Sequence, residues 1–158
     1  YRGLVGPYGG VTPEQALELA KDALLTGEPL LLMDARMEKA APRLRDGVRA
    51  IVELKRRVDP LLYAARYLDA VGLSVPHGLR ASVYVAPGRV LVPFARRDPQ
   101  PTGQFLMDTR ALGVTVQGTA QVWVAGSGAA TEGTLRVGED GVVELPVPAA
   151  EAGVVVVE

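Results

Sequence analysis

The fold of this chain is organised around one stretch, Gly27-Glu28-Pro29-Leu30-Leu31-Leu32-Met33-Asp34. Its four consecutive apolar residues, Leu30 to Met33, do not alternate with polar residues as a strand with one solvated face would. A continuous apolar run is typical of a strand covered on both faces, and such strands belong to parallel sheets joined by crossover helices. Since the chain offers almost none of the other strands, we interpret the run as the end of a larger α/β domain. The alternative is a short core segment of a smaller fold.

A helix is predicted on each side of this strand. Thr12-Pro13-Glu14-Gln15 is a capping box with proline at the first helical position, and Gly27 ends that helix in a left-handed conformation. The second helix is predicted from Pro42 to Arg57. Asp59-Pro60 is expected to interrupt it, and residues 61–68 then continue as a short helix or turn. A helix, a glycine and a buried strand form the second half of a βαβ unit.

From Gly72 onward, helical spacing gives way to short β-branched runs separated by glycine and proline, which predict an antiparallel β-sandwich. We expect one hairpin to join residues 80–85 to 89–94. A second hairpin is expected to join residues 132–137 to 142–147 through an Asp-Gly turn. The remaining predicted strands are 105–108, 119–124 and 153–157.

The predicted fold class is therefore α+β with two domains. Residues 1–71 form a helix-strand-helix remnant of an α/β barrel, and residues 72–158 form the antiparallel β-sandwich. Trp123 lies in the middle of a predicted strand, so we interpret it as a core residue and not as an exposed ligand platform.

Composition excludes several classes of function. The 158 residues carry a net charge of −1, which gives no reason to expect nucleic acid or an anionic membrane as a partner. There is no cysteine, and the single His77 cannot form a histidine metal cluster or a complete catalytic triad, so we expect no metal and no cofactor. No apolar run approaches the roughly 20 residues of a membrane span. Because the chain begins at Tyr1, we expect a processed or truncated product.

Charged side chains follow the organising strand. Asp34, Arg36 and Glu38 would emerge where the carboxyl ends of parallel strands face the ligand crevice, and we predict that they contact substrate there. The alternative is a solvated loop with a local ion pair. Tyr63 and Tyr67 are similarly open to two interpretations, as core residues with their hydroxyls at an edge or as rings that stack on a sugar.

The order of these features resembles the C-terminal end of bacterial glycoside hydrolases in which a (β/α)8 barrel is followed by an antiparallel β-domain. The similarity covers most of the chain, and it lies in the order of the predicted elements and in the composition of several short stretches. Its particular stretches are Leu54–Tyr63, Arg66–Asp69, Asp140-Gly141, Val147-Pro148-Ala149 and Val154–Val157.

The resemblance implies that this chain closes a barrel and carries its accessory sandwich. Glycosidases of this kind use two carboxyl groups that flank the scissile bond. In barrel families these groups sit on middle strands, which this chain would lack. No catalytic role is therefore assigned within the chain, and we expect the chain alone to be inactive.

Two other functions stay open. The first is a non-catalytic module whose sandwich binds a glycan or a protein while the helices act as a stalk. The second is a structural subunit of a bacterial envelope assembly, in which a partner chain covers Leu30–Met33, since an uncovered hydrophobic strand promotes aggregation. The glycoside hydrolase interpretation also requires further polypeptide over this strand, but as part of the same gene product.

Overall fold

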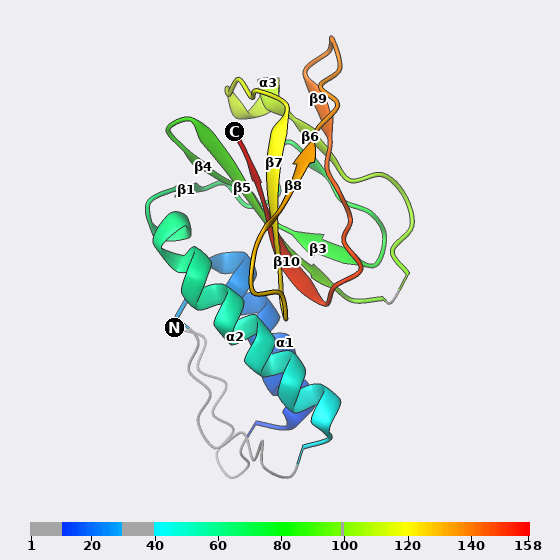
Figure 1. The fold of residues 1–158 in the computed structure, drawn as a ribbon. Coiled ribbons are helices and arrows are strands. Elements are labelled where there is room, and N and C mark those ends of the chain that lie inside the picture. Colours follow the sequence, from blue (N-terminus) through cyan, green and yellow to red (C-terminus); the bar gives the residue numbers. More distant parts are fainter. Residues whose placement is uncertain (1–10, 30–39, 99) are drawn as a thin grey trace.

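The computed structural model describes residues 11–29, 40–98 and 100–158 of the chain, and within these residues it is a mixed α+β fold with three helices and two antiparallel sheets. The elements in chain order are α1 (Pro13–Thr26), α2 (Pro42–Tyr63), β1 (Arg66–Tyr67), β2 (Leu73–Ser74), β3 (Leu79–Ala81), β4 (Tyr84–Ala86), β5 (Arg89–Arg96), β6 (Leu106–Asp108), α3 (Thr109–Leu112), β7 (Thr119–Val124), β8 (Thr131–Thr134), β9 (Val142–Glu144) and β10 (Ala152–Val157). In Figure 1, α1 and α2 lie side by side below the strands.

The larger sheet has seven strands, in the order β1-β4-β5-β10-β7-β8 with β3 also paired to β5, and the smaller sheet has the order β2-β6-β9. Strand β10 lies in the middle of the larger sheet, paired antiparallel with β5 on one side and with β7 on the other. Helix α1 packs against β5 and helix α2 packs against β10, so the helices cover one face of this sheet.

Alternation along β10 creates two separate cores. Val155 and Val157 point into a cluster shared with the smaller sheet, whereas Val154 and Val156 point into a cluster shared with the helices. All six residues of β10 are buried. The fold therefore has three layers: the helices, the larger sheet and the smaller sheet.

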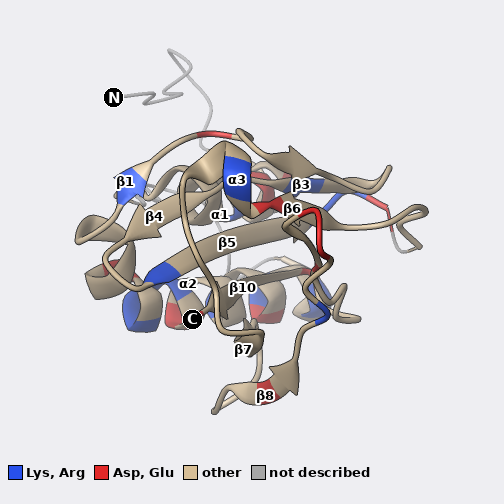
Figure 2. Ribbon diagram, turned by 90° about the horizontal axis from the view of Figure 1, so that it is seen from above, with Lys and Arg blue, Asp and Glu red and all other residues tan. Residues whose placement is uncertain are grey.

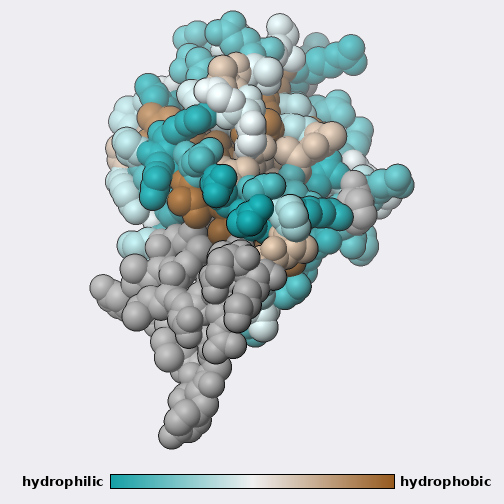
Figure 3. Space-filling model, turned by 60° about the horizontal axis from the view of Figure 1, so that its bottom comes forward, coloured by the Kyte–Doolittle hydropathy of each residue, from teal (hydrophilic) through white to brown (hydrophobic). Residues whose placement is uncertain are grey.

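Each core is filled mainly by aliphatic side chains. The core between the two sheets includes Val90, Val92, Phe94, Phe105, Met107, Leu112, Val122, Val143 and Leu145. The core between the helices and the larger sheet includes Leu24, Leu25, Ile51, Leu54, Val58, Leu62, Tyr84 and Leu91. Charged residues of both signs lie on α2, while the central parts of β5 and β10 carry none (Figure 2). Seen from below, the described surface is mostly hydrophilic with smaller apolar areas (Figure 3).

Helices α1 and α2 run in the same direction. Ala16 and Val48, near the starts of the two helices, share one small cluster, while Leu24 and Leu62, near their ends, share a larger one. Neighbouring parallel helices cannot be joined by a short turn. The end of α1 and the start of α2 therefore lie at opposite ends of the helix pair, and the 14 residues of α1 span about 21 Å.

The predicted ends of α1 are confirmed. The Thr12 side chain accepts a hydrogen bond from the Gln15 amide, the Gln15 side chain accepts one from the Thr12 amide, and Gly27 has a φ of 68°. The hydroxyl groups of Ser82 and Tyr84 both donate to the Leu25 carbonyl, one of the acceptors that a helix leaves free at its C-terminal end.

The predicted interruption of the second helix is wrong, because α2 continues through Pro60 to Tyr63. Proline removes one amide donor from a helix. Two contacts of neighbouring residues offset that loss: Leu62 is buried in the helix-facing core, and Asp59 pairs with Lys55 one turn earlier, at 2.5 Å. Tertiary packing thus overrides a local signal.

The strand predicted at residues 80–85 is divided into β3 and β4, although both keep one register against β5. The Ser82 amide donates to the Pro93 carbonyl. The second hydrogen bond of this antiparallel pair cannot form, because proline has no amide N–H to donate to the Ser82 carbonyl. The Val83 amide donates instead to the Asp69 carbonyl, and the Leu68 amide donates to the Val83 carbonyl. Next to Pro93, Val83 is therefore paired with Leu68 and Asp69 of a neighbouring loop and not with β5.

The predicted hairpin between residues 132–137 and 142–147 is confirmed only next to its turn, where Val137 bridges to Val143. Further from the turn, β8 pairs with β7 in the larger sheet and β9 pairs with β6 in the smaller one. The turn itself forms, with the Gly141 amide donating to the Gly138 carbonyl. Leu135 is buried in the core between the sheets, so the chain crosses from one sheet to the other before the turn.

Other predicted elements are confirmed. Strands β6, β7 and β10 form where the sequence predicts them, and β4 and β5 form the first predicted hairpin. Trp123 is partly buried and packs against the helix-facing core. The domain boundary at residue 71 stays a prediction. None of the described helices is both long enough and apolar enough to cross a membrane.

We predict that Gly153→Ala lowers the free energy of unfolding by about 1–3 kcal/mol, because an added Cβ would lie 2.5 Å from Cζ of Phe94 and 2.6 Å from the Trp123 carbonyl oxygen. Urea denaturation followed by tryptophan fluorescence measures this change. The matched control is Gly133→Ala in β8, where a Cβ meets nothing within 4 Å. Its effect should stay within about 0.5 kcal/mol, and equal effects of both substitutions would contradict this account of β10.

Candidate functional site

The strand Leu30–Met33 and the candidate contact residues Asp34, Arg36 and Glu38 lie outside the described residues, so their roles stay predictions. The described chain brings together two other groups of polar or aromatic side chains. One group surrounds Lys21, and the other surrounds Tyr84 near the C-terminal ends of α1 and α2.

Lys21 is a buried lysine whose ammonium group has three acceptors. The side chain is 5% exposed, and Nζ lies 3.0 Å from Oε1 of Glu18, 3.2 Å from Oε2 of Glu151 and 2.9 Å from the Arg96 carbonyl oxygen. Two of these contacts are hydrogen bonds, to Glu18 and to the Arg96 carbonyl, and the contact with Glu151 is an ion pair. Lys21 thus links α1 to the end of β5 and to the residue that precedes β10.

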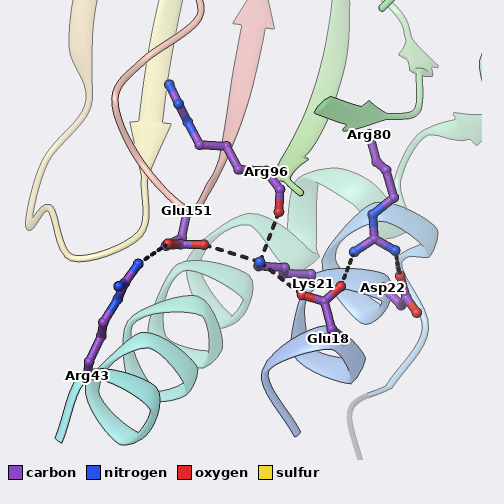
Figure 4. A network of polar contacts seen from close by, with 7 residues as sticks. All are labelled: Glu18, Lys21, Asp22, Arg43, Arg80, Arg96 and Glu151. Atoms are coloured by element: carbon purple, nitrogen blue, oxygen red, sulfur yellow. Dashed lines mark hydrogen bonds and ion pairs between the residues drawn. The ribbon is translucent and has the colours of Figure 1, made fainter. Parts of the chain in front are cut away.

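Two arginines extend this group (Figure 4). Arg80 of β3 pairs with Oε2 of Glu18 at 2.9 Å and with Asp22, one turn further along α1. Arg43 of α2 pairs with Oε1 of Glu151 at 3.4 Å, with its side chain 89% exposed. We call Glu18, Lys21, Asp22, Arg43, Arg80, Arg96 and Glu151 the Lys21 cluster. It connects both helices to the larger sheet.

The Lys21 cluster is a structural clamp and not a catalytic pair. A glycosidase needs two carboxyl groups that flank open space for a sugar. The space between Glu18 and Glu151 is occupied by the ammonium group of Lys21, with which both carboxylates pair. We therefore infer that the Lys21 cluster holds the two helices against the larger sheet.

Histidine and metal chemistry find no support in the described residues. His77 is exposed, and its Nδ1 lies 3.8 Å from Oδ2 of Asp98. Across the described ranges, no group of three or more His, Cys, Asp or Glu residues could hold a metal ion.

The second group centres on Tyr84. Its buried hydroxyl donates to the Leu25 carbonyl at 3.0 Å, and its ring lies 5.0 Å from the ring of Tyr67 with an interplanar angle of 56°. Burial raises the pKa of Tyr84 well above its ordinary value, with smaller contributions from Tyr67, Asp59, Glu28 and Tyr63. Both helix ends therefore meet at this tyrosine.

Tyr67 and Tyr63 lie at the surface beside Tyr84. The Tyr67 hydroxyl donates to Oδ1 of Asp69 at 3.2 Å. Partial burial raises the pKa of Tyr67, and the Asp69 carboxylate raises it further. Nζ of Lys55 lies 5.7 Å from the centre of the Tyr63 ring. The sequence analysis proposed Tyr63 and Tyr67 as core residues or as sugar-stacking rings. In the structure, both are exposed and lie near the buried Tyr84.

Two open hollows of about 390 Å³ each lie elsewhere on the described chain. One lies between the β4–β5 turn and residues 113–116, and Arg89 is the charged side chain in its lining. The other lies along β7 and β8, with Glu132 and Glu158 in its lining. Neither lining combines an acid with a base, so we assign no chemistry to them.

No protein-family model matches this sequence, and no curated protein matches it significantly. The likeness to glycoside hydrolases therefore stays a prediction from the order of features along the chain.

Sequence reasoning missed the Lys21 cluster. Its signal was a lysine on the apolar face of α1, four residues after Leu17 and three before Leu24. A lysine at such a position is buried only when acceptors surround it. Those acceptors come from Arg96 and Glu151, which lie far away along the sequence.

We predict that Lys21→Met lowers the free energy of unfolding by roughly 1–2 kcal/mol, because the partly buried Arg96 carbonyl loses a charged donor while the half-exposed carboxylates regain water. Chemical denaturation at pH 7 measures this change. Arg43→Ala is the control, since it removes the other cation of Glu151 from an exposed site and should cost less than about 0.5 kcal/mol. If both variants lost the same stability, burial would not be what makes Lys21 important.

We predict that the chain loses stability as the pH rises above 10. The folded state raises the pKa of Tyr84 above its ordinary value of 10.0, so the folded chain holds a proton that the unfolded chain releases. This stabilisation is fully present below pH 10 and is lost as the pH rises toward the folded pKa. Urea midpoints measured between pH 8 and pH 11.5 would record the loss.

Lysines also titrate in this range, so the comparison that isolates Tyr84 uses two variants. Tyr84→Phe should flatten the dependence on pH. Ser82→Ala removes the other hydroxyl bond to the Leu25 carbonyl without removing a tyrosine, and should keep the wild-type slope. Identical slopes in all three proteins would show that Tyr84 does not contribute.

Proposed function

We propose that this chain is the C-terminal portion of a carbohydrate-active, glycoside hydrolase-like protein. In this proposal α1, the connection that follows it and α2 close a (β/α)8 barrel, and the two sheets form its accessory β-sandwich. The observation that carries the proposal is that α1 and α2 are parallel neighbours.

Successive outer helices of a (β/α)8 barrel are parallel because each is separated from the next by a strand that runs the opposite way. The connection between Gly27 and Ala41 contains the apolar run Leu30–Met33. A strand rises about 3.3 Å per residue, so a short strand in this connection covers much of the required return. Helices of an antiparallel bundle would need no such segment.

The attachment of the sandwich also supports the proposal. The helices share one core with the larger sheet, and the Lys21 cluster fixes their positions on it. A sandwich held in this way would stabilise the last helices of a barrel. The same contacts weaken the stalk interpretation, because a stalk would project from the sandwich and not lie buried against it.

The proposal assigns catalysis to polypeptide outside this chain. Within the described residues the two close carboxylates, Glu18 and Glu151, are occupied by Lys21. Asp34, Arg36 and Glu38 follow the proposed last strand, and so would contact substrate at the rim of the barrel. This chain by itself would hydrolyse nothing.

The test compares the complete gene product that contains this sequence with the 158-residue chain, on a panel of aryl glycosides. We expect turnover by the complete protein and none by the chain. In the complete protein, Asp34→Ala should raise KM more than it lowers kcat, because a rim contact binds substrate without taking part in bond cleavage. The exposed Asp46→Ala on α2 is the control and should change neither constant.

Two results would overturn the proposal. The first is a native polypeptide whose intact mass equals the 16.7 kDa of this chain, because no barrel would then exist upstream. The second is turnover by the chain alone that Asp34→Ala abolishes.

A further inference from the structure

Exposed large apolar side chains are concentrated in one part of the described chain. Four such residues are exposed, Tyr63 at 62%, Tyr67 at 45%, Val71 at 51% and Val137 at 46%. The first three fall within nine residues of one another. Clustered exposed apolar groups on a protein surface commonly mark a binding site, whereas isolated ones need no explanation.

The two tyrosines of this group are held in place although they are exposed. The Tyr67 ring rests on the buried Tyr84, and its hydroxyl is bound by Asp69. Tyr63 directly follows Leu62, which shares the helix-facing core with Tyr84, and Nζ of the buried Lys55 lies 5.7 Å from the centre of the Tyr63 ring. Rings that are already fixed lose little freedom when a ligand binds, which favours affinity.

Asp69 has an unusual backbone conformation. Its φ of 57° makes it the one residue other than glycine with a positive φ in the described ranges. Most L-residues avoid the left-handed conformation, and aspartate is among the few that adopt it. The Val83 amide, which donates to the Asp69 carbonyl at 2.6 Å, helps to hold it. The conformation places a carboxylate next to the Tyr67 hydroxyl.

The charges around these rings favour one kind of ligand. Asp69 accepts the hydrogen bond of the Tyr67 hydroxyl, and Glu28 directly follows Gly27, where an added Cβ would lie 2.9 Å from the Tyr84 hydroxyl. Neither carboxylate forms an ion pair within the described residues. Carboxylates accept hydrogen bonds from hydroxyl groups and repel anions. The negative face of an aromatic ring attracts the slightly positive C–H groups of a sugar.

We propose that Tyr63 and Tyr67, with the carboxylates of Asp69 and Glu28, form a platform that binds an uncharged glycan. The tyrosine rings stack on the sugar and the carboxylates accept its hydroxyl groups. We expect uronic acid polymers and phosphate esters to bind less tightly, because the carboxylates of Asp69 and Glu28 repel anions. The class of ligand rests on the proposed function.

This platform is distinct from the proposed active site. It lies at the C-terminal ends of α1 and α2, where both helices approach Tyr84. Active sites of (β/α)8 barrels lie at the opposite end, where the outer helices begin. A glycan on the tyrosine platform would therefore anchor the protein to its substrate without being cleaved there.

The experiment is isothermal titration calorimetry of the 158-residue chain with four neutral hexaoses, from xylan, mannan, cellulose and starch, and with hexagalacturonate as the acidic counterpart. We expect at least one neutral hexaose to bind and the acidic one not to bind. Tyr63→Ala/Tyr67→Ala should weaken that binding by roughly tenfold or more, a loss of about 1.4 kcal/mol. Both rings are exposed, so the melting temperature of the variant should stay close to that of the wild type.

Val137→Ala is the matched control, because it removes an exposed apolar side chain from another part of the surface and should leave binding unchanged. Tyr67→Phe keeps the ring and should retain most of the affinity. The inference is overturned if no neutral hexaose binds, if the double variant binds as tightly as the wild type, or if the tyrosines instead mediate self-association in sedimentation velocity.

The two proposals fail separately. Hydrolysis by the complete protein together with unchanged binding in the double variant would reject the platform alone. Binding that depends on the tyrosines, in a complete protein that hydrolyses no glycoside, would reject the glycoside hydrolase proposal alone.

Discussion

Val154 and Val156 of β10 pack against the helices, while Val155 and Val157 of the same strand pack against the smaller sheet. One strand therefore belongs to both hydrophobic cores. Full burial of each valine side chain contributes about 1.5–3 kcal/mol, so removal of this strand would weaken both cores at once. Gly153 lies on the same side of β10 as Val155 and Val157 and leaves room for the ring of Phe94. The three layers depend on this two-sided burial.

Apolar contact alone does not fix how a helix sits on a sheet, because the hydrophobic effect has no direction. The Lys21 cluster and the hydroxyl bonds to Leu25 supply directional contacts at two places along α1. A buried ion pair often contributes little net stability, since desolvation opposes the attraction between the charges. We infer that the main effect of the cluster is to define one position of α1 relative to β3, β5 and β10.

The arrangement suggests a division of labour within this chain. The inner faces of α1 and α2 are used for packing, and the Lys21 cluster is used for attachment. The tyrosines near their C-terminal ends stay exposed, although the Tyr67 ring contacts Tyr84 of the helix-facing core, and we therefore propose that they bind a ligand. In our proposal, this chain supports catalysis by other polypeptide and binds a glycan through its exposed tyrosines, while its close carboxylates pair with Lys21.

The sequence alone determined the features that depend on neighbouring residues: the capping box at Thr12, the left-handed end at Gly27 and the hairpin between β4 and β5. It also singled out Tyr63 and Tyr67. Tertiary structure decided the persistence of α2 through Pro60, the separation of β8 from β9 and the burial of Lys21. Each of these depends on partners far away in the chain: the core around Leu62, the sheets that flank Leu135, and the acceptors from Arg96 and Glu151. Caps and tight turns depend on hydrogen bonds between residues that are close in the sequence. Burial of a side chain depends on segments that are far apart in the sequence and pack together only in the folded chain.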